Sequence, residues 1–250
     1  MQADEIESIE GRNAVTEALR AGTPLDKVYV LKGEANPAIA RIASLAREAG
    51  AVVVDADKRK LDAMSRTRSH QGVIATLPAV KYAEVQDILD AARGRGEVPL
   101  VIICDEISDP HNLGAIIRTA EACGAHGVIV PKRRSAGLTS VVAKTSAGAA
   151  FHLPTARVTN ITDTIKSLRD AGLWIYAASP EGEKSLWETE LTGPAAIVIG
   201  SEGRGIGRLI SENCDFFVRI PMAGKLSSLN ASVSAAVIMY EAARQRGLHK

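Results

Sequence analysis

Three loops carry polar and glycine residues in patterns that could bind a polar ligand and orient a reacting group. The first runs from Asp105 to Asn112, after the apolar run LVIIC and before a helical pattern that contains Arg118 about one turn in. Asn112 is expected to cap that helix, and Gly114 permits close approach of another backbone. From the residues alone, an ordinary capped helix with a solvated arginine is an equally good interpretation.

The second loop holds four glycines within eight positions: Gly200, Gly203, Gly205 and Gly207. Such a loop lets backbone approach a ligand or another segment closely. A dinucleotide fingerprint would need glycine where Arg208 stands, so the G-x-G-x-x-G pattern is not met. Glu202 would repel a pyrophosphate but could accept hydrogen bonds from ribose hydroxyls, an amine or an arginine. The alternative is a turn with a surface glutamate.

The third loop follows the apolar run FFVRI and leads through Ser227, Ser228 and Asn230 into a long helix rich in alanine and serine. Its GKLSS segment is not a P-loop, because Arg219 replaces the first glycine and Leu226 separates the lysine from the serines. The small side chains of the helix allow another backbone to pack closely. By themselves they favour packing within the chain over a dimer interface.

Elements typical of an α/β protein must position these loops. From Pro99 onward, near-continuous apolar runs predict buried parallel strands, and the three loops fall at their carboxyl ends, where open sheets form binding sites. Helices are expected at about 113–124, 139–149, 160–171, 204–212 and 229–246. Residues 1–77 alternate helix and strand signals and predict a smaller α/β unit. We expect domains at 1–78 and 98–250, joined by a linker at 79–97 that contains one short helix.

Composition excludes several classes. The 250 residues carry 30 Lys and Arg against 29 Asp and Glu, so the chain is not a globally basic nucleic-acid coat. No apolar run approaches the roughly 18 residues of a membrane span, and the acidic, polar start does not resemble a signal peptide. Three distant cysteines without CxxC spacing argue against a disulfide framework or a zinc site. We expect a cytoplasmic protein without a metal or a membrane partner.

The three loops resemble, in order and spacing, the three motifs of the SpoU (TrmH-like) branch of the SPOUT RNA methyltransferases. The matching segments are NLGAIIRTAEACG, IVIGSEGRGIGRLISENCD and IPMAGKLSSLNASVSAA. The front segments IEGRNAVTEAL and HQGVIA resemble the substrate-binding domain of the RlmB-type 23S rRNA guanosine 2′-O-methyltransferases. That domain is of a small ribosomal-protein type that binds kinked RNA. The resemblance therefore extends over nearly the whole chain.

The resemblance implies a parallel-sheet catalytic domain with a trefoil knot, S-adenosylmethionine as cofactor, and a homodimer formed through that domain. Knots are rare in protein chains, so the order of predicted helices and strands would not by itself predict one. The implied catalytic positions are Asn112, Arg118, Glu202, Ser228 and Asn230. The implied cofactor-binding positions are Gly200, Glu202, Gly205, Ile220, Met222, Ser228 and Leu229.

An RNA substrate requires local positive charge despite the neutral total. We expect RNA contacts from basic residues of the front domain and of the PKRR segment: Arg12, Lys58, Arg59, Lys60, Arg66, Arg68, Lys132, Arg133 and Arg134. Aromatic residues make up only 4% of the chain, which favours phosphate and 2′-OH contacts with folded RNA over base stacking. No DNA partner is expected.

The leading interpretation is an enzyme that methylates a ribose 2′-OH, most simply of a guanosine in the peptidyl-transferase P-loop of 23S rRNA. Within the family, the alternatives are tRNA ribose methyltransferases and the thiostrepton-resistance enzymes, which modify an rRNA adenosine. Outside it, a catalytically silent RNA-binding assembly factor would keep the same fold. A nicotinamide oxidoreductase is disfavoured because the glycine fingerprint fails.

Overall fold

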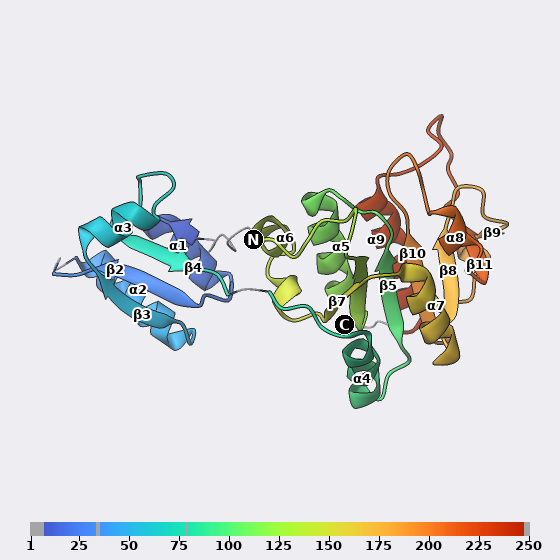
Figure 1. Cartoon of the computed structure of the whole chain (residues 1–250), viewed down its shortest axis with the longest axis horizontal. Helices are drawn as coiled ribbons and strands as arrows, with labels where there is room; N and C mark the ends of the chain where they lie inside the picture. Colours follow the sequence, from blue (N-terminus) through green and yellow to red (C-terminus); the bar gives the residue numbers. More distant parts are fainter. Residues whose placement is uncertain (1–7, 34–35, 79, 248–250) are drawn as a thin grey trace. The chain divides into compact units, whose positions relative to one another are not determined.

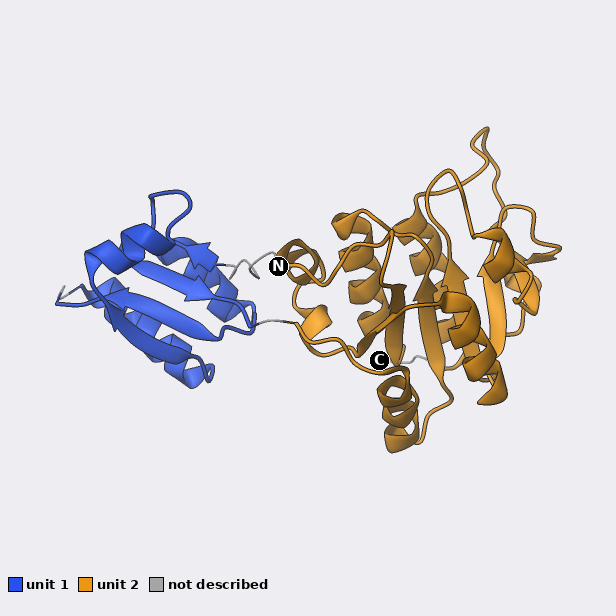
Figure 2. Cartoon of the chain, in the orientation of Figure 1, with its two compact units in different colours: residues 1–79 blue, residues 80–250 orange. Residues whose placement is uncertain are grey.

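The computed structural model describes residues 8–33, 36–78 and 80–247, which form two compact units. Figure 2 shows the first unit, residues 1–79, in blue and the second, residues 80–250, in orange. Residues 1–7, 79 and 248–250, at the edges of the domains and linker expected above, lie outside the described residues. Over the described ranges, no helix is both long and apolar enough to cross a membrane.

The first unit is a four-stranded sheet with strand order β1-β4-β2-β3 and helices on both faces. Its elements are β1 (Ser8–Glu10), α1 (Arg12–Arg20), β2 (Lys27–Leu31), α2 (Pro37–Glu48), β3 (Val52–Ala56), α3 (Lys58–Met64) and β4 (Val73–Thr76). Val15 of α1 and Ile42 of α2 pack on one face of the sheet, and Leu61 of α3 packs on the other. The predicted small α/β unit is confirmed, while β1 and α3 were not predicted.

The second unit is a seven-stranded sheet with order β7-β6-β5-β10-β8-β11-β9, and every pairing between its named strands is parallel. Its strands are β5 (Leu100–Cys104), β6 (Gly127–Pro131), β7 (Thr155–Val158), β8 (Trp174–Ala178), β9 (Lys184–Ser185), β10 (Ala195–Ile199) and β11 (Phe216–Arg219). Its helices are α4 (Val85–Arg95), α5 (Pro110–Ala122), α6 (Ser140–Thr145), α7 (Ile161–Asp170), α8 (Arg208–Ser211) and α9 (Ala231–Gln245), with 3-10 turns at Ala149–Phe151 and Leu186–Glu188.

Helices cover both faces of this sheet, which explains why its central strands are apolar at every position (Figure 1). Leu100 and Ile102 of β5 belong to a core with α5, α6 and α9. Val101 and Ile103, which point the other way, belong to a core with α4 and α7. All four side chains are buried. The two-part α/β architecture with a parallel sheet, expected from the sequence, is confirmed.

The segment expected as a linker differs from that expectation, because residues 80–97 pack within the second unit. Ile88 and Leu89 of α4 enter the core on one face of the sheet, and Ala83 forms a parallel bridge with Ala156 of β7. The expected helix at 204–212 is also shorter, since α8 covers only Arg208–Ser211. The glycines before it form a closed turn that has no helical conformation.

The strand order brings the chemically interesting loops together. The strands β5 and β10 are neighbours, and Cys104 at the end of β5 pairs with Ile199 at the end of β10. The first two loops therefore leave the same edge of the sheet side by side. Strand β8 lies next to β10, and β11 lies next to β8, so the third loop leaves the sheet two strands away from the second.

Candidate active site

The first loop ends in a helix cap, but not the one that the sequence suggested. Helix α5 begins at Pro110, and Asp109 caps it by accepting a 2.9 Å hydrogen bond from the His111 amide. The prediction that Asn112 caps the helix is wrong, because Asn112 already lies in its first turn. Its side-chain amide is consequently directed to other partners in the site.

Gly114 is required by helix packing. A Cβ at this position would lie 2.6 Å from Cβ of Thr145 in α6, well inside normal contact distance. The close approach predicted from this glycine therefore occurs, and the approaching group is the neighbouring helix α6. This packing fixes α5, and with it Asn112, against the body of the unit.

The glycine-rich loop after β10 is a closed turn. The backbone amides of Ser201 and Gly205 each donate to the carbonyl of the other, at 3.1 and 3.0 Å. Gly203 and Gly205 have φ of 84° and 66°, a region that favours glycine. Gly200 touches the returning chain, since its Cβ would lie 2.3 Å from the carbonyl carbon of Gly205. The loop thus closes backbone against backbone at Gly200.

Asp105 ties the first loop to the second. Its amide donates to the carbonyl of Ile199 at 2.8 Å, and its carboxylate Oδ2 accepts from the amide of Gly207 at 2.8 Å. The residue is buried, and this burial raises the pKa of Asp105, as does the nearby charge of Glu106, whereas the hydrogen bond from Gly207 lowers it. The two loops are therefore held in a defined relation before any ligand binds.

Three polar side chains, one from each loop, meet in a single hydrogen-bonded cluster. Nδ2 of Asn112 donates to Oε1 of Glu202 at 3.1 Å, and Nδ2 of Asn230 donates to Oδ1 of Asn112 at 3.0 Å. Asn230 also donates to Oε1 of Glu202. Its own Oδ1 accepts from the amide of Ser232 at 2.9 Å and so caps α9. We call Asn112, Glu202 and Asn230 the amide–carboxylate cluster.

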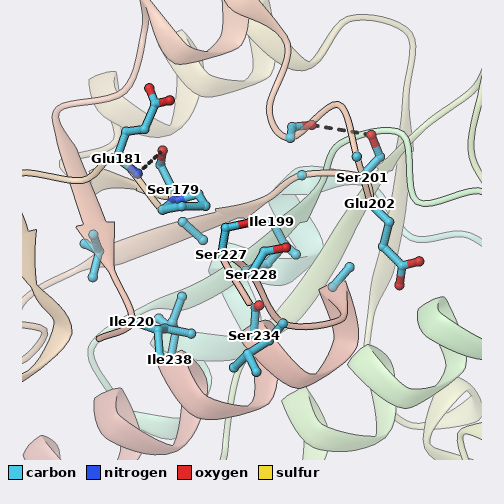
Figure 3. A pocket seen from close by; sticks show the side chains of 18 of the residues that line it. Ser179, Glu181, Ile199, Ser201, Glu202, Ile220, Ser227, Ser228, Ser234 and Ile238 are labelled. Atoms are coloured by element: carbon cyan, nitrogen blue, oxygen red, sulfur yellow. Dashed lines mark hydrogen bonds between the residues drawn. The ribbon is translucent and has the colours of Figure 1, made fainter. Parts of the chain in front are cut away.

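A cavity of about 440 Å³ lies beside this cluster, between the loops that follow β8, β10 and β11 (Figure 3). All seven positions expected to bind the cofactor line it, which are Gly200, Glu202, Gly205, Ile220, Met222, Ser228 and Leu229. Its walls combine apolar side chains such as Ile199 and Ile238 with the hydroxyls of Ser227 and Ser234. A volume in this range and a mixed lining are typical of a small-molecule site.

Part of the cavity wall was missed from the sequence. Ala178 at the end of β8 and Ser179, Pro180 and Glu181 of the loop after it line the cavity. The amide of Ser179 donates to the carbonyl of Val218 at 3.0 Å, and its Oγ accepts from the amide of Glu181 at 3.3 Å. The usable signal was that this polar segment also follows a predicted strand of the same sheet.

Arg118 stands apart from the cluster. It lies exposed on α5, does not line the cavity, and has no hydrogen-bond or ion-pair partner among the described residues. Its guanidinium is therefore available to a ligand. Across the same described residues, no group of three or more His, Cys, Asp or Glu side chains is arranged to hold a metal ion.

The expected RNA-binding residues occupy two separate regions. Lys58, Arg59 and Lys60 lie exposed on α3 of the first unit, and Arg66 and Arg68 lie on the turn that follows it. Arg12 begins α1 of the same unit. Lys132, Arg133 and Arg134 follow β6 in the second unit, where Arg134 pairs with Glu106 at 3.0 Å.

The cavity fits the cofactor that the sequence resemblance implies. The glycine turn lines the cavity with the backbone of Gly200, Gly203 and Gly205. Glycine at 200 lets the turn close on itself, because a Cβ there would collide with Gly205. Apolar side chains offer a surface for a base, and the serine hydroxyls and the carboxylates of Glu181 and Glu202 offer partners for hydroxyl and ammonium groups. These are the functional groups of S-adenosylmethionine.

Comparison with known proteins agrees with this arrangement. Residues 99–240 match the model of the SpoU rRNA Methylase family, and residues 8–83 match that of the RNA 2′-O ribose methyltransferase substrate binding domain. A Bacillus subtilis (strain 168) protein, YacO, whose name assigns it to the TrmH family of tRNA/rRNA methyltransferases, is 44% identical over 236 residues, covering 94% of each chain. A protein of Mycobacterium sp. (strain KMS), called an uncharacterized tRNA/rRNA methyltransferase, is 46% identical over 98% of this chain and 78% of its own.

Solved structures of SpoU methyltransferases resemble this chain over nearly its whole length. The SpoU methyltransferase AviRb from Streptomyces viridochromogenes, in complex with AdoMet, superposes with a TM-score of 0.71 at 27% identity, covering 98% of this chain and 92% of its own. A structure described as an RNA 2′-O ribose methyltransferase gives a TM-score of 0.65 at 30% identity, covering 98% of this chain and 90% of its own. The chain with this cavity and this amide–carboxylate cluster belongs to the SpoU rRNA methylase family and is an S-adenosylmethionine-dependent RNA methyltransferase.

Proposed function

We propose that this enzyme methylates a ribose 2′-OH, and that its substrate is a guanosine in the peptidyl-transferase P-loop of 23S rRNA. The observation that carries the proposal is the amide–carboxylate cluster beside the cofactor cavity, which presents an amide donor and carboxylate and amide acceptors suited to a hydroxyl group. The substrate-binding model matched by residues 8–83 is described as one of RNA 2′-O ribose methyltransferases, which supports the ribose as acceptor. The RlmB-like front segment supports the guanosine.

In this proposal the chain's residues align the reactants. S-adenosylmethionine supplies an activated methyl group, so transfer to an oxygen requires in-line approach and loss of the hydroxyl proton. Asn230 uses both Nδ2 hydrogens on Asn112 and Glu202 and its Oδ1 on the start of α9, so it positions the other two side chains. Asn112 donates one Nδ2 hydrogen to Glu202, and its second Nδ2 hydrogen then holds the ribose hydroxyl. Ser228 lines the cavity and orients the cofactor there. The 2′-OH proton passes to water or to a phosphate oxygen of the RNA.

Arg118 binds the phosphate next to the target ribose. A guanidinium is protonated at all physiological pH values, so it is a poor general base but an effective bidentate phosphate ligand. Its exposure on α5, without a partner among the described residues, supports this role. We expect Arg118→Lys, measured by methyl transfer to RNA, to reduce kcat/KM about 100-fold. Full activity with unchanged RNA affinity would rule out an essential bidentate contact.

Three further features belong to the proposal. We propose that the loops after β10 and β11 form the trefoil knot implied by the family resemblance, and that two chains pair through the second unit. Most of the alanines of α9 are buried in the core of that unit, whereas Val233 and Tyr240 of α9 are exposed and available for such pairing. We also propose that the basic residues of α3, of the turn after it and of the segment after β6 contact RNA phosphates. A cytoplasmic site of action follows from an rRNA substrate.

The proposal is tested by incubating the protein with tritiated S-adenosylmethionine and protein-free 23S rRNA from a strain that lacks the enzyme. We expect one 2′-O-methyl group per molecule, at a guanosine of the P-loop. Bulk tRNA is the parallel substrate, because the relatives' names include both tRNA and rRNA. Transfer to tRNA alone, or to an rRNA adenosine, would replace the 23S guanosine. Cofactor binding without transfer to any RNA would favour a silent assembly factor.

A further inference from the structure

One carboxylate holds the turn that follows α3 in the first unit. Glu10, at the end of β1, accepts hydrogen bonds from Ser65 Oγ at 2.6 Å, from the Arg66 amide at 2.6 Å, and from the amide and Oγ1 of Thr67 at 3.3 and 2.6 Å. Burial raises the pKa of Glu10, but these hydrogen bonds outweigh it and lower the pKa to about 2. The side chain is thus ionised, and donors surround its charge.

The hydroxyls of Ser65 and Thr67 also accept hydrogen bonds from later amides of the turn. Ser65 Oγ accepts from the amide of Arg68 at 2.9 Å, and Thr67 Oγ1 accepts from the amide of Ser69 at 3.2 Å. Each hydroxyl therefore donates to Glu10 and accepts from the backbone two or three residues later. The amides of four consecutive residues, 66–69, depend directly or through one hydroxyl on this single carboxylate.

The far end of the turn is fixed in the same way. Nδ1 of His70 accepts from the amide of Gly72 at 3.0 Å, and its Nε2 lies 3.0 Å from Oδ1 of Asp62. The side chain of Gln71 accepts from the amide of Arg12 at 3.2 Å, which joins the turn to the start of α1. The turn is therefore formed before any ligand arrives, which reduces the entropy lost on binding.

Two residues of the turn have strained backbone conformations, which is typical of a ligand site. Arg68 and Gln71 adopt φ of 58° and 51°, in the left-handed region that side chains other than glycine disfavour. Such residues persist only where surrounding contacts hold them, and they cluster at ligand sites. Arg68 is exposed, with Lys60 of α3 and Arg12 of α1 on the elements that adjoin the turn. The strain therefore fixes where a guanidinium is presented.

We infer that Glu10 is a positioning residue for RNA: it builds a pre-formed, basic turn over residues 65–72 that binds backbone phosphates through arginine. The inference rests on the proposed RNA substrate. Arginine forks suit bidentate phosphate contacts, and such contacts set the register of the RNA without reading bases. Glu10 acts only through the turn and touches neither RNA nor cofactor.

The test compares Glu10→Gln with Glu17→Gln in the full chain. Both remove one negative charge from the first unit, but the Glu17 carboxylate lies on the exposed side of α1, where it pairs with Arg20. RNA affinity is measured against salt concentration with deproteinised 23S rRNA and with bulk tRNA. For Glu10→Gln we expect about tenfold weaker binding and a log–log salt slope smaller by about one. Cofactor affinity and kcat at saturating RNA should match wild type.

A second measurement needs no RNA. Trypsin cleaves after arginine, and the hydrogen-bonded turn should protect residues 66 and 68, so Glu10→Gln is expected to be cut there faster than Glu17→Gln. If Glu10→Gln does not fold, Thr67→Val takes its place in both measurements. Thr67→Val removes one donor hydroxyl and keeps the shape of the side chain, so we expect faster cleavage and weaker RNA binding than in wild type.

Equal RNA affinity, salt slope and cleavage in Glu10→Gln and Glu17→Gln would overturn the inference. The proposed function fails separately: a wild type that binds RNA but transfers no methyl group to it refutes the activity, and weaker binding by Glu10→Gln in that case still supports the turn. A wild type that binds neither RNA would contradict both.

Discussion

Replacing Gly200 with alanine should weaken cofactor binding and slow methyl transfer. The added Cβ would lie 2.3 Å from the carbonyl carbon of Gly205, 2.5 Å from its oxygen and 2.5 Å from the amide nitrogen of Ile206. Normal van der Waals contact begins at 3.4 Å, so the turn would have to retreat by about 1 Å, a shift that can reduce a rate about 100-fold in a positioned site. All three atoms belong to the backbone, so no side-chain rotation relieves the collision.

Gly207→Ala is the matched control. Its Cβ would meet Oδ2 of Asp105 at 3.4 Å and Cδ1 of Ile210 at 3.9 Å, both ordinary contacts, and its φ of −58° suits alanine. Calorimetric titration with S-adenosylmethionine should show weaker binding for Gly200→Ala and near wild-type binding for Gly207→Ala, and methyl transfer by Gly200→Ala should fall about 100-fold. Wild-type affinity in Gly200→Ala would refute the close-approach argument for this turn.

Three other perturbations separate roles that the structure combines. Asn230→Asp keeps the oxygen that caps α9 but places a second carboxylate against Glu202; methyl transfer should fall more than about 100-fold, whereas urea denaturation should show a loss of at most about 1 kcal/mol. Arg246→Ala removes a guanidinium that donates to four backbone carbonyls, and the free energy of unfolding should drop by about 3 kcal/mol; a change below about 1 kcal/mol would contradict that bonding. The pKa of Glu10 is lowered from 4.5 to about 2, so its ionised form stabilises the fold above pH 4.5 and this contribution is lost as pH falls toward 2. Urea titrations from pH 7 to 2 should therefore show a smaller loss of unfolding free energy at acid pH in Glu10→Gln than in wild type.

Strongly apolar elements were predictable from the sequence, whereas short or mixed ones were not. The run at Leu100–Cys104 is buried on both faces and shows as five consecutive apolar residues. Strand β7, Thr155–Val158, contains an exposed arginine, and β9 is two residues long, so neither produces a strand signal. A short helix was expected where α4 lies, but it was assigned to a linker because only Ile88, Leu89 and Ala92 of this otherwise polar helix are buried.

Within the site, residue types could be identified but their partners could not. Asn112 was expected to cap α5, but Asp109 caps that helix and frees Asn112 for Glu202. Asn230, which the sequence placed only at the start of a helix, is the residue that caps α9. These residues lie far apart along the chain, so their spacing in the sequence does not show that they are in contact. The order of the strands brings them together, and that order is known only once the sheet has formed. Glu10 was missed for the same reason, since its partners lie more than 50 residues away.

The most direct test of the central claim uses an RNA in which the nucleotide that accepts the methyl group carries a 2′-deoxyribose and all other nucleotides are unchanged. Transfer of tritium from S-adenosylmethionine is measured for this RNA and for the unmodified one, with binding of both RNAs to the protein as control. The account predicts equal binding and transfer only to the unmodified RNA. Equal transfer to both would contradict a ribose 2′-OH as the acceptor.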